Sequence, residues 1–302
     1  MQEQPESGVG PHRESQGPAS ADSPGRSRSR MGSYLRSYVL FALPAILLLA
    51  VFFIGPLLVN FQESLQLDKT YPSLGHYSKF FGDAYYLMVL GHTVLFGVGV
   101  TILCLIFGYP FAYALAEAQG RWKVVLLFIV VAPLLTNVVV RSYGWMIVLG
   151  GTGLVNTVLG RLGLEPLELM YTWTAVTIAM THVLLPFAVL SIASVLEGRD
   201  RALEEAALTL GASPTRVFRE IVFPLSLEGV VTAAILVFTL SVGSFVTVLL
   251  LGKTSTMTVA VLIYQQLMVV SNWGFGAAMG IILLALVLAS LAMHSRLRPR
   301  KA

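Results

Sequence analysis

The chain has 302 residues, of which 56% are hydrophobic and only 12% are charged, and its formal net charge is +4. Soluble globular domains carry roughly 25% charged residues and could not bury this much apolar surface. The composition therefore excludes a water-soluble protein and predicts an all-α polytopic membrane protein in a lipid bilayer. The single cysteine, Cys104, and the scattered histidines predict neither a disulfide framework nor a metal site. The small net charge lies in loops, so we expect no nucleic-acid partner.

The first 34 residues differ in composition from the rest of the chain. They are rich in Ser, Pro, Gly and Arg and poor in large apolar side chains, which predicts a disordered cytoplasmic tail. Met31 opens a more ordinary amino terminus, so residues 1–30 are either a genuine extension or the product of an upstream start codon. Residues 298–302 form a second, short cytoplasmic tail. The sequence between the tails, residues 35–297, is expected to form one transmembrane domain.

Six apolar segments in this domain are long enough to cross a bilayer, which takes roughly 20 residues of helix. Prolines and glycines interrupt several of them, and neighbouring helices can satisfy the backbone groups that such breaks expose. The predicted spans are Tyr38–Phe61, Leu87–Ala116, Val124–Leu149, Trp173–Leu196, Val230–Leu251 and Phe275–His294.

The distribution of lysine and arginine predicts the orientation of these spans. One set of tails and loops holds fourteen of these residues, whereas the alternate loops hold only four: Lys69, Lys79, Arg161 and Lys253. Cytoplasmic loops carry the excess of positive charge, so both termini and the loop between the fourth and fifth spans are predicted to be cytoplasmic.

Polar side chains within the third and fourth spans are candidates for the translocation pathway, because polar groups at membrane depth are costly. Arg141 is the most unusual of them, with Asn137 one turn before it and Tyr143 and Trp145 just after it. The alternative is that Arg141 extends to the outer interface within an aromatic belt. His182 in the fourth span is a further candidate, although a helix–helix hydrogen bond would also explain it.

The cytoplasmic loop 197–225 carries charges of both signs and the signature of two short helices. Asp200 is placed to cap a first helix, and Gly211 to end it in the left-handed conformation. Ser213 then caps a second helix whose first residue is Pro214. The alternative is a loop lying on lipid headgroups, but such helices are usually rich in Lys and Arg alone. A compact helix–turn–helix of this kind suits a groove on a partner protein.

Helical spacing makes further predictions for this loop. Leu203, Ala207 and Leu210 share one face of the first helix, and Val217, Phe218 and Ile221 share one face of the second. Two (i, i+4) ion pairs are predicted as well, Arg201 with Glu205 and Arg216 with Glu220.

The fifth span carries Ser241, Ser244 and Thr247 at helical spacing, which predicts a polar stripe. Such a stripe can serve helix packing or line a pathway.

The loop residues together resemble the EAA motif of ABC importer permeases, EAA-x3-G-x9-I-x-L-P. The matching positions are Glu205, Ala206, Ala207, Gly211, Ile221 and Pro224, with Phe223 in place of the motif's leucine. The resemblance implies the type I ABC importer permease fold, with six transmembrane helices and a cytoplasmic coupling helix that docks on the ATPase. Phe218, on the apolar face of the second helix, is included in this coupling site.

The same resemblance implies the partners of the chain. They are a second homologous permease subunit, two copies of an ABC ATPase, and a periplasmic or extracellular solute-binding protein at the bacterial inner membrane. The chain has no GxxxxGK[ST] motif, so we expect it to be a transport subunit with no cofactor and no enzymatic activity of its own. ATP would be bound by the partner ATPase.

Several segments, among them Ala132–Asn156 and Leu262–Ala278, resemble the first permease of spermidine/putrescine-type importers, which implies a polyamine substrate. The predicted spans contain no interior Asp or Glu, so carboxylates for a polycation would come from other subunits. An amino acid, a phosphonate or another organic ion remains the alternative, with Arg141 as the partner of an anionic group. A gradient-driven secondary transporter would need intramembrane carboxylates or matched helix breaks, and an integral membrane enzyme would need a catalytic cluster.

Overall fold

The structure is a computed structural model that describes the backbone of residues 26–66 and 72–297 and the side chains of residues 43–66 and 72–292. This part of the chain is helical, with no β-strand among the described residues beyond one isolated bridge between Gln66 and Pro72. The all-α fold is therefore confirmed. The predicted tail at 298–302 and residues 1–25 lie outside the described residues, whereas residues 26–34 are helical rather than disordered.

The chain divides into two units, Met1–Leu57 and Leu58–Ala302, and each is considered by itself. The described residues of the first unit belong to α1 (Arg26–Ser64), a long helix that contains Pro44 and Pro56. Its apolar side chains are exposed from Leu43 onwards, as expected of a helix surrounded by lipid or by a partner. The second unit contains all the other helices and the candidate sites.

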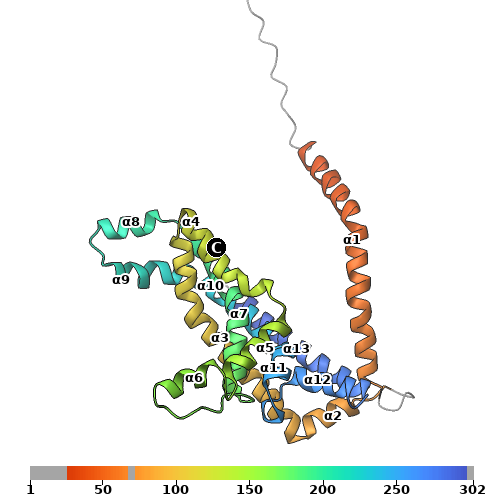
Figure 1. The fold of residues 1–302 in the computed structure, drawn as a ribbon. Coiled ribbons are helices and arrows are strands. Elements are labelled where there is room, and N and C mark those ends of the chain that lie inside the picture. Colours follow the sequence, from red (N-terminus) through yellow and green to blue (C-terminus); the bar gives the residue numbers. More distant parts are fainter. Residues whose placement is uncertain (1–25, 67–71, 298–302) are drawn as a thin grey trace, which may run out of the picture. The chain divides into compact units, whose positions relative to one another are not determined.

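The helices of the second unit are shown in Figure 1. In chain order they are α2 (Gly75–Gly82), α3 (Ala84–Glu117), α4 (Gly120–Val131), α5 (Val138–Leu149), α6 (Leu154–Arg161), α7 (Trp173–Glu197), α8 (Ala202–Thr209), α9 (Pro214–Val217), α10 (Phe223–Val242), α11 (Val246–Leu251), α12 (Val259–Met268) and α13 (Trp273–Leu297). Two 3₁₀ segments, Ala132–Leu135 and Thr254–Thr256, and a π-helical turn, Phe218–Val222, lie between them.

Six helical stretches among the described residues are long and apolar enough to cross a membrane, as predicted. They are Leu43–Ser64, Ala84–Glu117, Val138–Arg161, Trp173–Glu197, Pro214–Val242 and Trp273–Ala292. Four of them overlap the predicted spans closely. The third and fifth predicted spans have different bounds in the structure. Both differences change where candidate pathway residues lie relative to the helices.

The predicted third span, Val124–Leu149, is not one helix. It consists of α4, a 3₁₀ turn that contains Pro133, and α5. The break has a local cause, since Asn137 caps a new helix by accepting a hydrogen bond from the Val139 backbone N–H at 2.8 Å. The third candidate span therefore starts at Val138, and Asn137 lies at its boundary rather than within it.

The predicted fifth span, Val230–Leu251, is displaced and broken. Its helix α10 begins at Phe223 and ends at Val242, and α11 begins at Val246 as a separate element. As a consequence, Ser241, Ser244 and Thr247 do not form the single stripe that was predicted. The earlier start also brings Glu228, which lay outside the predicted span, into the second turn of α10.

The core of the second unit is a packed group of three helices, α3, α7 and α10, that lie beside each other in Figure 1. Glycines allow two of the close approaches. A Cβ on Gly108 of α3 would lie 3.2 Å from the Ala188 Cβ of α7. A Cβ on Gly229 of α10 would lie 3.1 Å from Val195, which also belongs to α7. The space between these helices is filled by buried side chains, including Val100, Cys104, Ile192 and Ala233. The loop that carries α8 and α9 extends from this core.

Candidate coupling site and its ion network

The first loop helix, α8, is shaped by local capping. The Ala202 N–H donates to the Asp200 carboxylate at 3.0 Å, but the N-cap of the helix is Arg201, one residue after the predicted cap Asp200, and it makes no side-chain cap bond. The acidic side chains of Glu204 and Glu205 lie in the first turn, where their negative charge interacts favourably with the positive end of the helix dipole. Gly211 ends the helix with φ of +86°, a conformation that an L-residue with a Cβ rarely adopts, so the prediction of a left-handed glycine is confirmed.

The second loop helix starts as predicted and continues without interruption into the membrane. Ser213 accepts a hydrogen bond from the Arg216 N–H at 3.3 Å, and Pro214 occupies the first helical position. Helix α9 then passes through the π-helical turn Phe218–Val222 into α10. Helix α9, the π-helical turn and α10 are therefore one continuous helical rod, since no non-helical residue separates them.

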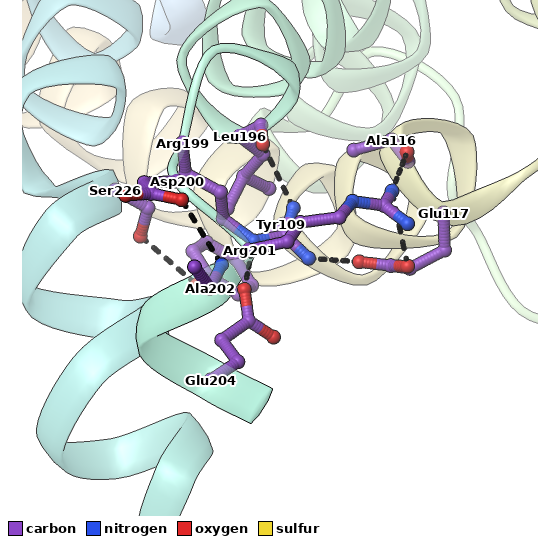
Figure 2. A network of polar contacts seen from close by, with 10 residues as sticks. All are labelled: Tyr109, Ala116, Glu117, Leu196, Arg199, Asp200, Arg201, Ala202, Glu204 and Ser226. Atoms are coloured by element: carbon purple, nitrogen blue, oxygen red, sulfur yellow. Dashed lines mark hydrogen bonds and ion pairs between the residues drawn. The ribbon is translucent and has the colours of Figure 1, made fainter. Parts of the chain in front are cut away.

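Arg199, between α7 and α8, is the centre of a network of polar contacts (Figure 2). Its guanidinium pairs with Glu117 at the end of α3 and with Glu204 of α8, and it donates to the Leu196 carbonyl of α7 at 2.8 Å. Only 3% of the Arg199 side chain is exposed. One buried cation thus connects the carboxyl-terminal ends of two core helices, α3 and α7, with the first loop helix.

The charge of Arg199 is stabilised by its partners. Burial lowers the pKa of this arginine, but the hydrogen bonds and negative charges of Glu204 and Glu117 outweigh burial, so the pKa lies above its ordinary value. The guanidinium also lies over the Tyr113 ring, with 5.8 Å between the guanidinium carbon and the ring centroid. Arg199 therefore stays protonated throughout the physiological pH range.

Arg201 joins the same network instead of making the predicted pair with Glu205. Its guanidinium lies 3.3 Å from the Glu117 carboxylate and donates to the Ala116 carbonyl at 3.2 Å. The prediction was wrong because Arg201 is the N-cap of α8 rather than a residue within it, so its side chain turns back toward α3. The second predicted pair, Arg216 with Glu220, is present at 3.0 Å on an exposed face.

Aromatic packing attaches the second loop helix to the core. The Phe218 ring lies 5.9 Å from the Tyr109 ring and 5.8 Å from the Tyr113 ring, both edge to face, and 6.4 Å from the Phe223 ring. The Tyr109 and Ser226 hydroxyls share a hydrogen bond of 2.9 Å between α3 and α10 (Figure 2). Val217 is buried and Ile221 half-buried, which confirms the predicted apolar face of this helix.

The residues of the EAA motif divide between solvent and core. Glu205 and Ala206 are exposed, whereas Ala207 is half-buried and packs against the core. Ile221 also contacts the core, and Phe223 and Pro224 at the start of α10 are exposed. The first loop helix presents further apolar side chains to its surroundings. They are Leu203, Leu208 and Leu210, which are 49%, 48% and 88% exposed.

The pathway candidates of the third and fourth spans form two separate groups of contacts. Arg141 donates to the Pro133 carbonyl, across the break that precedes α5, and Asn137 serves as the cap of that helix. The Trp145 indole N–H donates to Nδ1 of His182 at 3.3 Å, joining α5 to α7. Tyr143 is 53% exposed. The structure thus brings together Trp145 and His182, which the sequence treated separately.

The three candidates near the fifth span have different surroundings. Ser241 is buried and donates to the Phe238 carbonyl of its own helix. Ser244, in the break after α10, donates to the Met180 sulfur of α7 at 3.4 Å. The Thr247 hydroxyl of α11 accepts from Ser142 of α5 at 3.3 Å. The break after α10 therefore connects this region with both α5 and α7.

Sequence reasoning missed the ion network. Arg199 was counted only as a cytoplasmic positive charge, and Glu117 and Tyr109 were not singled out. Glu117 and Arg199 are 82 residues apart, so no helical spacing relates them. One signal was present, since both follow directly on long apolar segments that end on the same predicted side of the membrane.

Comparison with known proteins defines the class to which this arrangement belongs. Residues 108–302 match the family described as binding-protein-dependent transport system inner membrane component. The chain is 33% identical over 275 residues to the spermidine/putrescine transport system permease protein PotB of Haemophilus influenzae, covering 89% of this chain and 93% of that protein. It is 35% identical over 224 residues to PotB of Escherichia coli, covering 72% and 82%.

The fold also resembles a solved structure. The crystal structure of a bacterial alginate ABC transporter in complex with alginate pentasaccharide-bound periplasmic protein contains a chain that matches with a TM-score of 0.73. The two chains are 18% identical, and the match covers 89% of this chain and 96% of the other. This likeness concerns the fold, which is that of ABC importer permeases.

The chain belongs to the family of binding-protein-dependent transport system inner membrane components. It is a permease subunit of an ABC importer, a transport component rather than an enzyme, and a multi-pass protein of the inner membrane.

Proposed function

We propose that this permease forms half of the translocation pathway for a polyamine of the spermidine or putrescine type. The observation that carries this proposal is the similarity to PotB proteins of two organisms over 72–89% of the chain. The exposed aromatic ring of Tyr143 and the half-buried indole of Trp145 offer faces that suit an amine cation. Carboxylates for the remaining charges would come from the second permease and the solute-binding protein.

The surroundings of Arg141 give little support to the alternative, an anionic substrate held by this arginine. Its guanidinium is turned to the Pro133 carbonyl at the break before α5, so part of its hydrogen-bonding capacity serves the backbone. An arginine in this role stabilises a helix break instead of holding an anionic solute.

The partners proposed for the chain are a homologous second permease, two ATPase subunits and a solute-binding protein, with both termini in the cytoplasm.

Within this assembly we assign ATPase docking to the EAA loop. The exposed apolar side chains of α8 and the open, left-handed turn at Gly211 suit a helix that enters a groove on a partner. The pathway residues proposed from the sequence keep their assignment, with Trp145 and His182 now a contacting pair.

The substrate is tested by uptake of radiolabelled spermidine and putrescine into proteoliposomes that contain the importer, its binding protein and internal ATP. Saturable uptake of either amine that unlabelled polyamines inhibit, and that glutamate and phosphate do not, is the expected result. Uptake of an anionic solute with no uptake of either amine would overturn the polyamine assignment.

The docking assignment has its own test, which is independent of substrate. Gly211→Asp forces a Cβ into a conformation with φ of +86°, and Glu205→Lys reverses an exposed charge of the motif. Both variants should insert into the membrane but recover at least tenfold less ATPase when the permease is purified by affinity. Gly160→Ala in α6, where a Cβ meets no atom within 4 Å, is the matched control and should recover the parental amount. Parental recovery with both loop variants would refute docking through α8.

A further inference from the structure

The first loop helix has almost no packing of its own to hold it in place. None of the residues of α8 is buried, and its covalent connection to α7 is the short segment Gly198–Arg201. A helix of eight residues without a buried face has little stability alone. Apart from the packing of Ala207 against the core, its position therefore depends on the contacts at its amino-terminal end.

These contacts converge on one residue of another span. Glu117, the last residue of α3, pairs with Arg199 through one carboxylate oxygen and with Arg201 through the other. Arg199 reaches Glu204 inside α8 with a second edge of the same guanidinium, at 2.5 Å. The two arginines balance the charges of the two glutamates, so the group is neutral as a whole.

From this geometry we infer that Arg199 is a positioning residue that clamps α8 to the cytoplasmic end of α3, so that the second span moves together with the coupling helix. The inference rests on the proposed docking of α8 on the ATPase. It adds a mechanical connection that chain order does not provide, because α8 is covalently continuous only with the fourth and fifth spans.

The chemistry of arginine suits this role. A guanidinium presents donors along several edges of a rigid plane, and Arg199 uses them toward Glu117, Glu204 and the Leu196 carbonyl at once. A lysine ammonium is a point charge on a flexible stem and cannot hold three acceptors in this fixed arrangement. Because Arg199 is buried, its bonds are shielded from water and salt far more than an exposed pair would be.

The clamp also explains how force on α8 would reach the middle of the membrane. Helices α3 and α7 pack closely at Gly108 and Ala188 and are connected again at their cytoplasmic ends through Arg199. Displacing α8 therefore displaces two packed core helices as a pair. Without the clamp, α8 would pivot on the segment Gly198–Arg201.

The position of α8 can be measured directly in the permease. Nitroxide labels at Gln119→Cys, just beyond α3, and Leu210→Cys, at the end of α8, report the distance between the two elements by pulsed dipolar spectroscopy. The buried Cys104 is replaced by serine. The parent should give a narrow distance distribution, and Glu117→Gln and Arg199→Gln should each broaden it at least twofold, with Arg199→Lys between them and the parent.

The matched control removes a different ion pair at the same membrane edge. Lys123 of α4 lies 2.9 Å from Glu197 of α7, an ion pair that includes no residue of α8. Lys123→Gln should leave the distribution unchanged. If Glu117→Gln and Arg199→Gln both retained the parental width, the clamp would be refuted.

A second readout uses the assembled importer in proteoliposomes with labelled spermidine. Glu117→Gln should keep ATPase recovery and ATP hydrolysis within twofold of the parent while uptake per ATP hydrolysed falls at least fivefold. Unchanged uptake per ATP in this variant would overturn the proposed movement of α3 with α8. If the parent transports no polyamine, the substrate assignment fails, whereas the distance measurement still decides whether the clamp exists.

Discussion

The two short helices of the loop between α7 and α10 are attached to the same core in different ways. Helix α8 has no buried residue and is held at its base by ion pairs from Arg199 and Arg201, while its leucines face outward. Helix α9 buries Val217, continues into α10 and packs the Phe218 ring among three other aromatic rings. The difference teaches that one helix is exposed and held mainly by charge, whereas the other is anchored by packing in its own subunit.

The largest effect should come from removing the aromatic anchor. Phe218→Ala deletes contacts with Tyr109, Tyr113 and Phe223. Because Phe218 is only half-buried, we expect a loss of about 2–3 kcal/mol of unfolding free energy, below the range for a fully buried phenylalanine. A lower melting temperature of the purified permease in detergent would show it.

The contrasting variant on the displayed helix is Leu208→Ala. This side chain is 48% exposed, so its removal should leave the melting temperature within about 1 °C of the parent, since isolated surface substitutions rarely exceed ±0.5 kcal/mol. ATPase affinity should fall instead. If Leu208→Ala lowered the melting temperature as much as Phe218→Ala, the two helices would not differ as described.

An intermediate effect is expected at the hydrogen bond between α3 and α10. Tyr109→Phe keeps the ring that packs on Phe218 but removes the hydroxyl that shares a 2.9 Å hydrogen bond with Ser226. The expected loss is about 1 kcal/mol, because Ser226 retains its bond to the Phe223 carbonyl. Thermal unfolding measured beside Phe218→Ala would separate ring packing from hydrogen bonding, and equal losses in the two variants would argue against this division.

The smallest effect belongs to the exposed ion pair of the second helix. Arg216 and Glu220 are paired at 3.0 Å, but their side chains are 66% and 61% exposed. Arg216→Gln should cost no more than about 0.5 kcal/mol, and high salt should reduce this difference further. Melting temperatures at low and high ionic strength provide the measurement. A loss as large as that of Tyr109→Phe would show that exposure does not weaken this pair.

The sequence predicted the parts of the molecule that depend on local chemistry. The cap at Ser213, the left-handed turn at Gly211 and six membrane-length helices all follow from residue type, spacing and segment length. The breaks within the helices were harder to predict from the sequence. Pro133 and Asn137 near the third span, and Gly243 at the end of α10, are ordinary residues within apolar stretches until their hydrogen bonds are known.

The ion network could not have been predicted by the same means. The partners of Arg199 lie on α3, on α7 and inside α8, and only the packing of α3 against α7 brings their ends together. For the same reason Arg201 was assigned to Glu205, its neighbour in a regular helix, although it pairs with Glu117 at 3.3 Å. Pairing across helices is a property of the tertiary fold and leaves no periodic trace in the sequence.

The continuity of α9 and the π-helical turn with α10 sets a length scale for the fifth span. Helix α10 has 20 residues and is therefore about 30 Å long at a rise of roughly 1.5 Å per residue. A tilt of such a rod by about 10° about its loop end would displace its far end by about 5 Å. That far end is the break at Gly243, where Ser244 contacts Met180 of α7. If the loop docks on the ATPase as proposed, a small movement of the loop would therefore become a larger displacement at this break.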